Sequence, residues 1–213
     1  IGGQLSWRFV AEEVRDFAFA SSSGYVWDAT RTTVPDGSGG SQSVLVNALY
    51  RPGAPVWENA AGYGQHATRF LSEAVVPYPY PQITIAEGPI GGMEYPMLVF
   101  IGRPGSEPAL YGVIAHEIAH QWFPMLVGQD EAAYAWMDEG SATYLEALAV
   151  GDFFEDPAPH EIDRASYLGV AGSDIEVPLM RHTHLVNPQL ARTVAAYFKP
   201  ASLLRSLSAP LGA

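Results

Sequence analysis

The sequence predicts an α+β fold with a sheet-containing lobe followed by a helical lobe, and three observations carry this prediction. Short runs of β-branched and aromatic residues dominate the first hundred positions, and helical spacing dominates after Ser106. The composition, 48% hydrophobic and 16% charged, is that of a globular protein with a core. Strands that precede helices along the chain are typical of the α+β class.

The first half of the chain is expected to form the sheet and one helix that covers it. Five runs have strand-like composition: residues 7–20, 24–28, 43–50, 82–87 and 96–101. A Gly/Ser-rich stretch over residues 36–43 predicts a turn. Residues 55–74 repeat apolar side chains every three to four positions, which indicates a helix that ends before Pro77.

The second half is expected to be helical. Ser106 can cap a helix over residues 107–123, and Asp138 can cap a second helix that runs to Val150. Residues 188–207 predict one or two further helices. Because the first of these helices follows the last predicted strand, we expect the two lobes to meet along it.

The composition also restricts partners and ligands. Lys and Arg number 11 and Asp and Glu 23, and the resulting net charge of −12 disfavours a nucleic-acid partner. No apolar run is long enough to predict a membrane span. The chain has no cysteine, so a metal must be bound by His, Asp or Glu. These features leave cytoplasmic, periplasmic and extracellular locations open.

The clearest functional signal lies in the helix expected after Ser106. Its residues 110–122 are almost all apolar, yet they include His116, Glu117 and His120. The two histidines are one helical turn apart, so both imidazoles project from the same stripe. This pattern binds zinc, and the glutamate stays free to take a proton from the metal-bound water. Two core histidines beside a surface carboxylate are the less favoured alternative.

A catalytic zinc site needs a third protein ligand and an open position for water. Eighteen residues separate His120 from Glu139, which lies in the sequence W-M-D-E-G at the start of the next predicted helix. Thr143 and Glu146 return to the same helical face as Glu139. One of them could hydrogen-bond the outer nitrogen of a zinc-bound histidine.

Three other residues have competing interpretations. Asp138 is expected to cap the helix that Glu139 opens, although its carboxylate could instead orient a metal ligand. His182 and His184 form an H-x-H pair that can bind metal. They follow Pro178 in a predicted loop, and we do not assign them to the site.

The H-E-x-x-H sequence, the eighteen-residue gap and the glutamate in W-x-D-E-G resemble the gluzincin metallopeptidases of the aminopeptidase N and leukotriene hydrolase family. Residues 91–95, G-G-M-E-Y, are similar to that family's G-x-M-E-N motif, whose glutamate binds the free α-amino group of the substrate. Residues 197–199, Y-F-K, are similar to its Y-x-K motif, whose tyrosine stabilises the oxyanion. The four motifs follow the family's order over about half of the chain.

This resemblance implies a thermolysin-like zincin catalytic domain over residues 21–213, without the family's closing helices at its C-terminal end. Residues 1–20 are expected to be the tail of a preceding β-rich domain or the first strands of this one. Two motif positions differ from the family. Tyr95 replaces the usual asparagine, and Pro200 replaces the usual glycine, which fits a proline in the first turn of a helix.

The resemblance further implies a zinc-dependent aminopeptidase with one Zn²⁺ per chain. The metal ligands would be His116, His120 and Glu139. Glu117 would act as general base on a zinc-activated water, and the Tyr197 hydroxyl would stabilise the oxyanion. The substrate amine would be bound by Glu94 with its neighbours Gly91, Gly92 and Met93. The expected partners are peptides with a free N-terminus and further domains of the same polypeptide.

Two other readings remain open. A zinc-bound hydroxide is not selective for amides, so an endopeptidase or an epoxide hydrolase is an alternative hypothesis. A catalytically silent zinc-binding scaffold is the second alternative. The intact Glu117 and Tyr197 argue against the scaffold.

Overall fold

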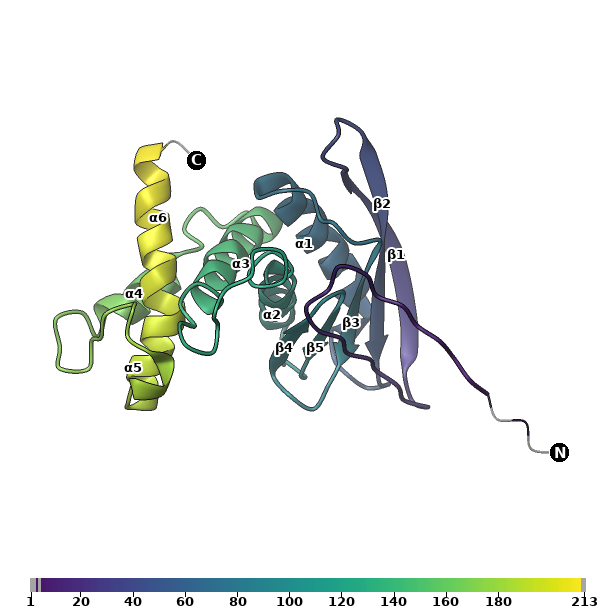
Figure 1. Cartoon of the computed structure of the whole chain (residues 1–213), viewed down its shortest axis with the longest axis horizontal. Coiled ribbons are helices and arrows are strands. Elements are labelled where there is room, and N and C mark those ends of the chain that lie inside the picture. The colour runs from purple at the N-terminus through teal and green to yellow at the C-terminus, as the bar shows by residue number, and fades with distance from the viewer. Residues whose placement is uncertain (1–2, 4, 212–213) are drawn as a thin grey trace.

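A mixed sheet lies on one side of the molecule, and helices stack outward from one of its faces (Figure 1). The computed structural model describes residue 3 and residues 5–211. The predicted α+β class is confirmed. The structure does not describe residues 1, 2, 4, 212 and 213, which belong to the outer ends of the two predicted domain ranges. The ranges themselves stay a prediction.

The sheet has five strands. In spatial order they are β1 (Val26–Pro35), β2 (Ser41–Tyr50), β3 (Gln82–Glu87), β5 (Leu98–Ile101) and β4 (Gly92–Tyr95). β1 and β2 form an antiparallel hairpin, β2, β3 and β5 run parallel, and β4 returns antiparallel to β5. Within the described residues β4 is therefore an edge strand, and no strand pairs with its outer edge.

Four of the predicted strand runs are confirmed in whole or in part, and one is wrong. The described residues before Val26 form no strand, although residues 7–20 have strand-like composition. The side chains of Trp7, Phe9 and Phe19 are 74%, 75% and 74% exposed, so no neighbouring layer of the described chain covers them. β4 escaped prediction because glycines interrupt its short pattern.

The helices form successive layers over the sheet. α1 (Ala60–Ala74) and α2 (Glu107–Ala119) cover one sheet face, and α3 (Glu139–Phe154) packs against α2. Beyond α3 lie α4 (Glu161–Leu168), α5 (Gln189–Thr193) and α6 (Lys199–Leu211). Short 3-10 turns occupy Trp57–Asn59 and Thr183–Leu185, and a π-helical turn over Val194–Phe198 joins α5 to α6.

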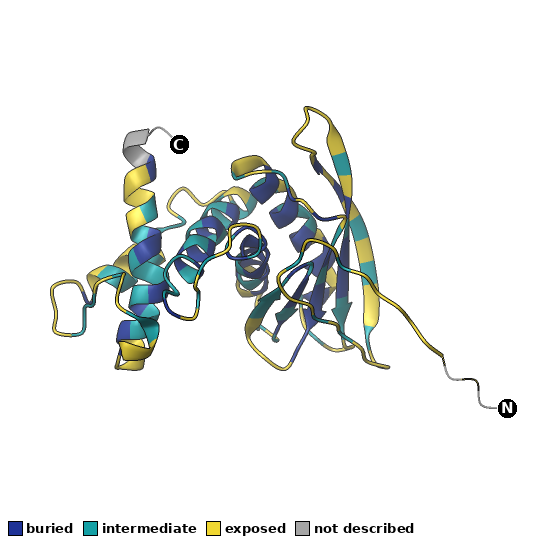
Figure 2. Ribbon diagram, in the orientation of Figure 1, coloured by how far each residue is buried: buried dark blue, intermediate teal, exposed yellow. Residues whose placement is uncertain are grey.

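α2 lies between the sheet and α3, and it is buried on most sides, as its apolar sequence predicts (Figure 2). The predicted cap is confirmed, because Ser106 Oγ accepts a hydrogen bond from the Ala109 backbone N–H at 3.4 Å. The helix ends at Ala119, one turn before the predicted end at Phe123. Its polar side chains near the C-terminal end must therefore find partners on neighbouring elements.

α3 runs past its predicted end at Val150. Gly151, a residue type that often follows a helix, lies inside α3. A Cβ on Gly151 would lie 2.8 Å from Pro159 Cγ, so the glycine permits close packing of the loop that follows. The residue with left-handed backbone conformation that ends α3 is Glu155, at φ 54°. α4 was not predicted; it is only eight residues long and buries none of them.

Candidate active site

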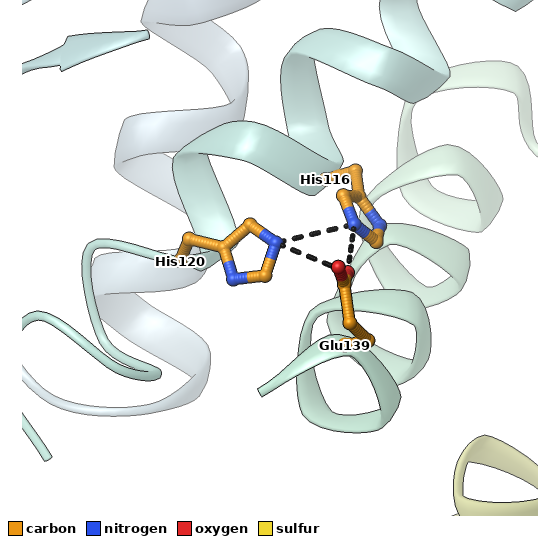
Figure 3. A group of neighbouring side chains, drawn as sticks. All are labelled: His116, His120 and Glu139. Atoms are coloured by element: carbon orange, nitrogen blue, oxygen red, sulfur yellow. Dashed lines mark hydrogen bonds and ion pairs between the residues drawn. The ribbon is translucent and has the colours of Figure 1, made fainter. Parts of the chain in front are cut away.

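α2 and α3 bring His116, His120 and Glu139 together (Figure 3). His116 Nε2 lies 3.1 Å from Glu139 Oε2 and 3.2 Å from His120 Nε2, and His120 Nε2 lies 3.5 Å from Glu139 Oε2. Ligand atoms about 2.0 to 2.2 Å from a tetrahedral zinc would be about 3.3 to 3.6 Å apart. The three side chains therefore fit a zinc ion with small adjustments.

The outer nitrogen of each imidazole is held by the protein. His116 Nδ1 lies 3.0 Å from Glu146 Oε2. His120 Nδ1 lies 2.7 Å from the Phe123 carbonyl oxygen and 2.8 Å from Asp138 Oδ1. Such contacts fix the ring orientation and the tautomer of metal-binding histidines. They direct the Nε2 atoms of both rings toward one point.

These contacts resolve the competing interpretations of neighbouring residues. Asp138 occupies the N-cap position of α3, as predicted, but its side chain makes no capping hydrogen bond there, and its carboxylate lies against His120 instead. Of the two candidates on α3, Glu146 contacts His116, whereas Thr143 donates from Oγ1 to the Glu139 carbonyl at 2.7 Å. His182 and His184 lie at the 3-10 turn Thr183–Leu185, and neither is among the described residues that line the main cavity.

The charge of the site favours a bound cation. Burial opposes protonation of His116, yet hydrogen bonds to Glu139 and Glu146 outweigh it and raise the His116 pKa to about 9. Burial alone would raise the pKa of Glu139, but the hydrogen bonds from His116 and His120 hold that pKa well below its usual range. Carboxylates that favour positive charge on the imidazoles in this way would equally favour a metal cation bound between them.

Glu117 points from α2 into the same site without joining the ligand triangle. It is 6% exposed, and its Oε2 has no hydrogen-bond partner among the described residues. Burial raises the Glu117 pKa to about 7, against the opposing effect of His116 and His120. A Cβ on Gly92 would collide with Glu117 Oε1, so a glycine at this point of β4 is what lets the carboxylate lie against the strand.

A cavity of about 840 Å³ opens over these groups. All nine residues that the sequence predicts for the site line it: Gly91, Gly92, Met93, Glu94, His116, Glu117, His120, Glu139 and Tyr197. The lining also includes Arg103, Ile162 and Asp163, which no sequence motif marked. Burial and the nearby Glu146 raise the pKa of Asp163 to about 7.

Tyr197 reaches the cavity from the π-helical turn between α5 and α6. Its hydroxyl donates to Glu139 Oε1 at 2.6 Å, and its ring lies nearly parallel to that of His116 at 6.0 Å. Burial and the negative charge of Glu139 raise the pKa of Tyr197, so the hydroxyl keeps its proton and remains a hydrogen-bond donor. Single π-helical turns are frequent at functional sites.

β4 carries Glu94 into the cavity, and Gln121, two residues past the end of α2, fixes the turn that follows this strand. Gln121 is fully buried, donates from Nε2 to the Tyr95 carbonyl at 2.9 Å, and accepts from the Met97 N–H at 2.9 Å. A glutamine in an apolar helix was visible in the sequence, but its partners were not. Burial raises the pKa of Glu94, and the nearby His120 partly opposes this effect.

The fold and the site together define the class of protein: a zinc metallopeptidase domain of the gluzincin type, with two histidines from one helix and a glutamate from the next. Within that class, the chain belongs to peptidase family M1. The sequence profile of the Peptidase family M1 domain matches residues 68–213. The family predicted from the four motifs is thereby confirmed.

Similar proteins agree with this assignment. Aminopeptidase M1-D of Oryza sativa subsp. japonica is 29% identical over 159 residues, which cover 64% of this chain and 18% of that protein. Leucine aminopeptidase 2 of Neosartorya fischeri is 28% identical over 153 residues, 69% of this chain and 23% of that protein. The crystal structure of an M1 zinc metallopeptidase from Deinococcus radiodurans is 27% identical, with a TM-score of 0.61, and the match covers 84% of this chain and 40% of that one.

The chain thus spans about a fifth of the length of these two curated relatives. In the part of the chain that the structure describes, no helix combines the length and the apolar character that a membrane crossing requires.

Proposed function

We propose that the protein is a zinc-dependent aminopeptidase that hydrolyses the N-terminal peptide bond of peptides. The observation that carries this proposal is the position of Glu94 beside the ligand triangle. Glu94, Glu117 and His120 each have a ligand atom within 4.8 Å of the other two. The plant relative and the fungal relative are both named aminopeptidases, which supports the proposal.

His116, His120 and Glu139 would hold one Zn²⁺ per chain, and the spacing of their ligand atoms supports this assignment. When bound there, zinc would polarise the substrate carbonyl and lower the pKa of a water molecule. The contacts from Glu146 and Asp138 would keep both imidazoles in the ligating orientation.

Glu117 would act as the general base and then as the general acid. Its unpartnered Oε2 is available to accept a proton from the attacking water and to deliver it to the leaving amine. Burial raises the pKa of this carboxylate, which favours a group that both accepts and returns a proton. Gly92 matters for this role, because any larger residue would push the carboxylate away.

Tyr197 would stabilise the developing oxyanion. Its hydroxyl is already a donor at the edge of the ligand triangle, where it bonds Glu139 Oε1. A substrate carbonyl oxygen near the same triangle could accept this hydrogen bond instead. A donor aimed at the place where negative charge develops is among the larger contributions to catalysis.

Glu94 would make the enzyme an exopeptidase. A carboxylate pairs with an ammonium group, and this carboxylate lies within 4.8 Å of a ligand atom of His120. An ammonium bound there leaves room for only one residue between the chain end and the scissile carbonyl. The first peptide bond is therefore the one presented for hydrolysis.

The test uses the whole protein with zinc and one peptide in two forms, with a free and with an acetylated N-terminus. We expect mass spectrometry to show release of the first amino acid from the free peptide and little change in the acetylated one. Internal cleavage of the acetylated peptide would make the protein an endopeptidase. Stoichiometric zinc without turnover of any substrate would make it a scaffold.

A further inference from the structure

One cationic side chain lines an otherwise acidic cavity. Among the described lining residues, Arg103 is the only arginine or lysine. The lining also contains the two histidines of the ligand triangle and five carboxylates: Glu94, Glu117, Glu139, Glu146 and Asp163. None of the steps proposed above uses Arg103. A guanidinium at this place therefore needs its own explanation.

Arg103 is held from behind by a buried carboxylate. Glu87, at the end of β3, has a fully buried side chain and accepts a hydrogen bond from Arg103 Nε. Glu87 also accepts from Nη2 of Arg51 at 2.6 Å and from the Arg51 backbone N–H at 2.6 Å. Burial alone would raise the pKa of Glu87, but the two arginines outweigh it and lower that pKa to about 2.

Two guanidinium groups thus share one carboxylate, which leaves one positive charge without a matching negative charge in this cluster. The Arg103 side chain is 44% exposed. Its Nη atoms make no hydrogen bond or ion pair with any described residue. Because Nε is engaged by Glu87, the planar group is fixed while its outer edge stays open. Such an edge matches the two oxygens of a carboxylate.

Arg103 and Glu94 lie near the same end of the cavity lining. The Gly102 N–H donates to the Gly91 carbonyl at 3.0 Å, so Arg103 follows a residue that lies beside the start of β4, the strand that carries Glu94. Both side chains line the same cavity. The outer edge of β4, unpaired within the described residues, could hold a short peptide by backbone hydrogen bonds.

We infer that Arg103 binds the C-terminal carboxylate of short peptide substrates, so that short peptides with a free C-terminus are preferred. This inference rests on the proposed aminopeptidase function, because it places the substrate amine at Glu94. Glu94 and Arg103 then recognise the two charged ends of one small zwitterion. Longer peptides would reach Arg103 with an uncharged peptide group and would gain less.

The test compares a tripeptide with its C-terminal amide, using the whole zinc-loaded protein. We expect the parent to favour the free acid about 10- to 100-fold in kcat/KM. Arg103→Gln should bring this ratio close to one, because the loss in kcat/KM falls mainly on the free acid. Arg51→Gln is the matched control, because it removes the other guanidinium from Glu87 but does not line the cavity. It should keep the preference.

Three outcomes would overturn the inference: no preference for the acid in the parent, equal losses on acid and amide in Arg103→Gln, or the same change in Arg51→Gln. A parallel measurement separates this question from the aminopeptidase proposal. Calorimetric titration of both tripeptides into Glu117→Gln, with and without Arg103→Gln, reads binding without turnover. If no peptide is cleaved but the acid still binds more tightly through Arg103, only the proposed activity fails. Equal affinities would refute the role of Arg103.

Discussion

Replacement of Glu94 by Ala separates an aminopeptidase from a general zinc hydrolase. Truncation of one partner of a buried charge pair costs about 2 to 5 kcal/mol. Glu94 is half-buried, so the lower part of this range applies, about 2 to 3 kcal/mol, or about 30- to 160-fold in kcat/KM. The loss should fall on substrates with a free amine, because only they carry the ammonium that Glu94 would pair with.

The assay is a two-by-two comparison of parent and Glu94→Ala on a free and an acetylated version of one peptide. The acetylated peptide, used poorly by the parent, should change little. Glu94→Gln is the control for shape, since it keeps the volume and removes the charge, and it should lose nearly as much as Glu94→Ala. Equal losses on both peptides, or a full rescue by glutamine, would refute a role for the Glu94 charge.

Three further predictions follow from the same geometry. Glu117→Gln should keep zinc in metal analysis and lower kcat by about 10²- to 10⁴-fold; activity within tenfold of the parent would exclude it as the base. Glu146→Ala frees the outer nitrogen of His116 and should weaken zinc binding about 10- to 100-fold in chelator competition, with unchanged affinity as the contrary result. Glu87, whose pKa falls from 4.5 to about 2 on folding, stabilises the fold fully above pH 4.5. This contribution is lost as the pH drops from 4.5 toward 2, so Glu87→Gln should flatten that part of a Tm-versus-pH curve, and parallel curves would contradict the assignment.

The sequence was sufficient for the parts of the site that lie on one helix or follow a short spacing rule. His116 and His120 share a helical face whatever the rest of the fold does, and a glycine before Glu94 signals a close approach of backbone to another group. Partners that come from distant segments could not be predicted. Asp138 resembled a helix cap because favoured capping residues are short and polar, and only the placement of α2 against α3 brings it to His120.

The same limit explains why no role was predicted for Arg103 and why strands were wrongly predicted within residues 7–20. An arginine after a strand is an ordinary surface residue in sequence, and its meaning depends on the buried Glu87 at the end of a neighbouring strand. Residues 7–20 have the composition of strands, but a strand needs a partner, and these residues pair with no strand of the described chain. Composition records what a segment can form, whereas pairing depends on what lies next to it.

Tyr95 and Pro200 are the two residues that differ from the family's motifs, and each makes contacts here that do not require the family's usual residue. Tyr95 contributes its backbone carbonyl to Gln121, and its ring packs edge-on against Phe100 at 6.1 Å. Pro200 lies in the first turn of α6, as predicted, and packs so closely on Gly140 that a Cβ there would collide with the proline ring. Gly140 directly follows Glu139 in α3. The proline therefore fastens α6, and with it the turn that carries Tyr197, to the end of α3 that presents the glutamate of the ligand triangle.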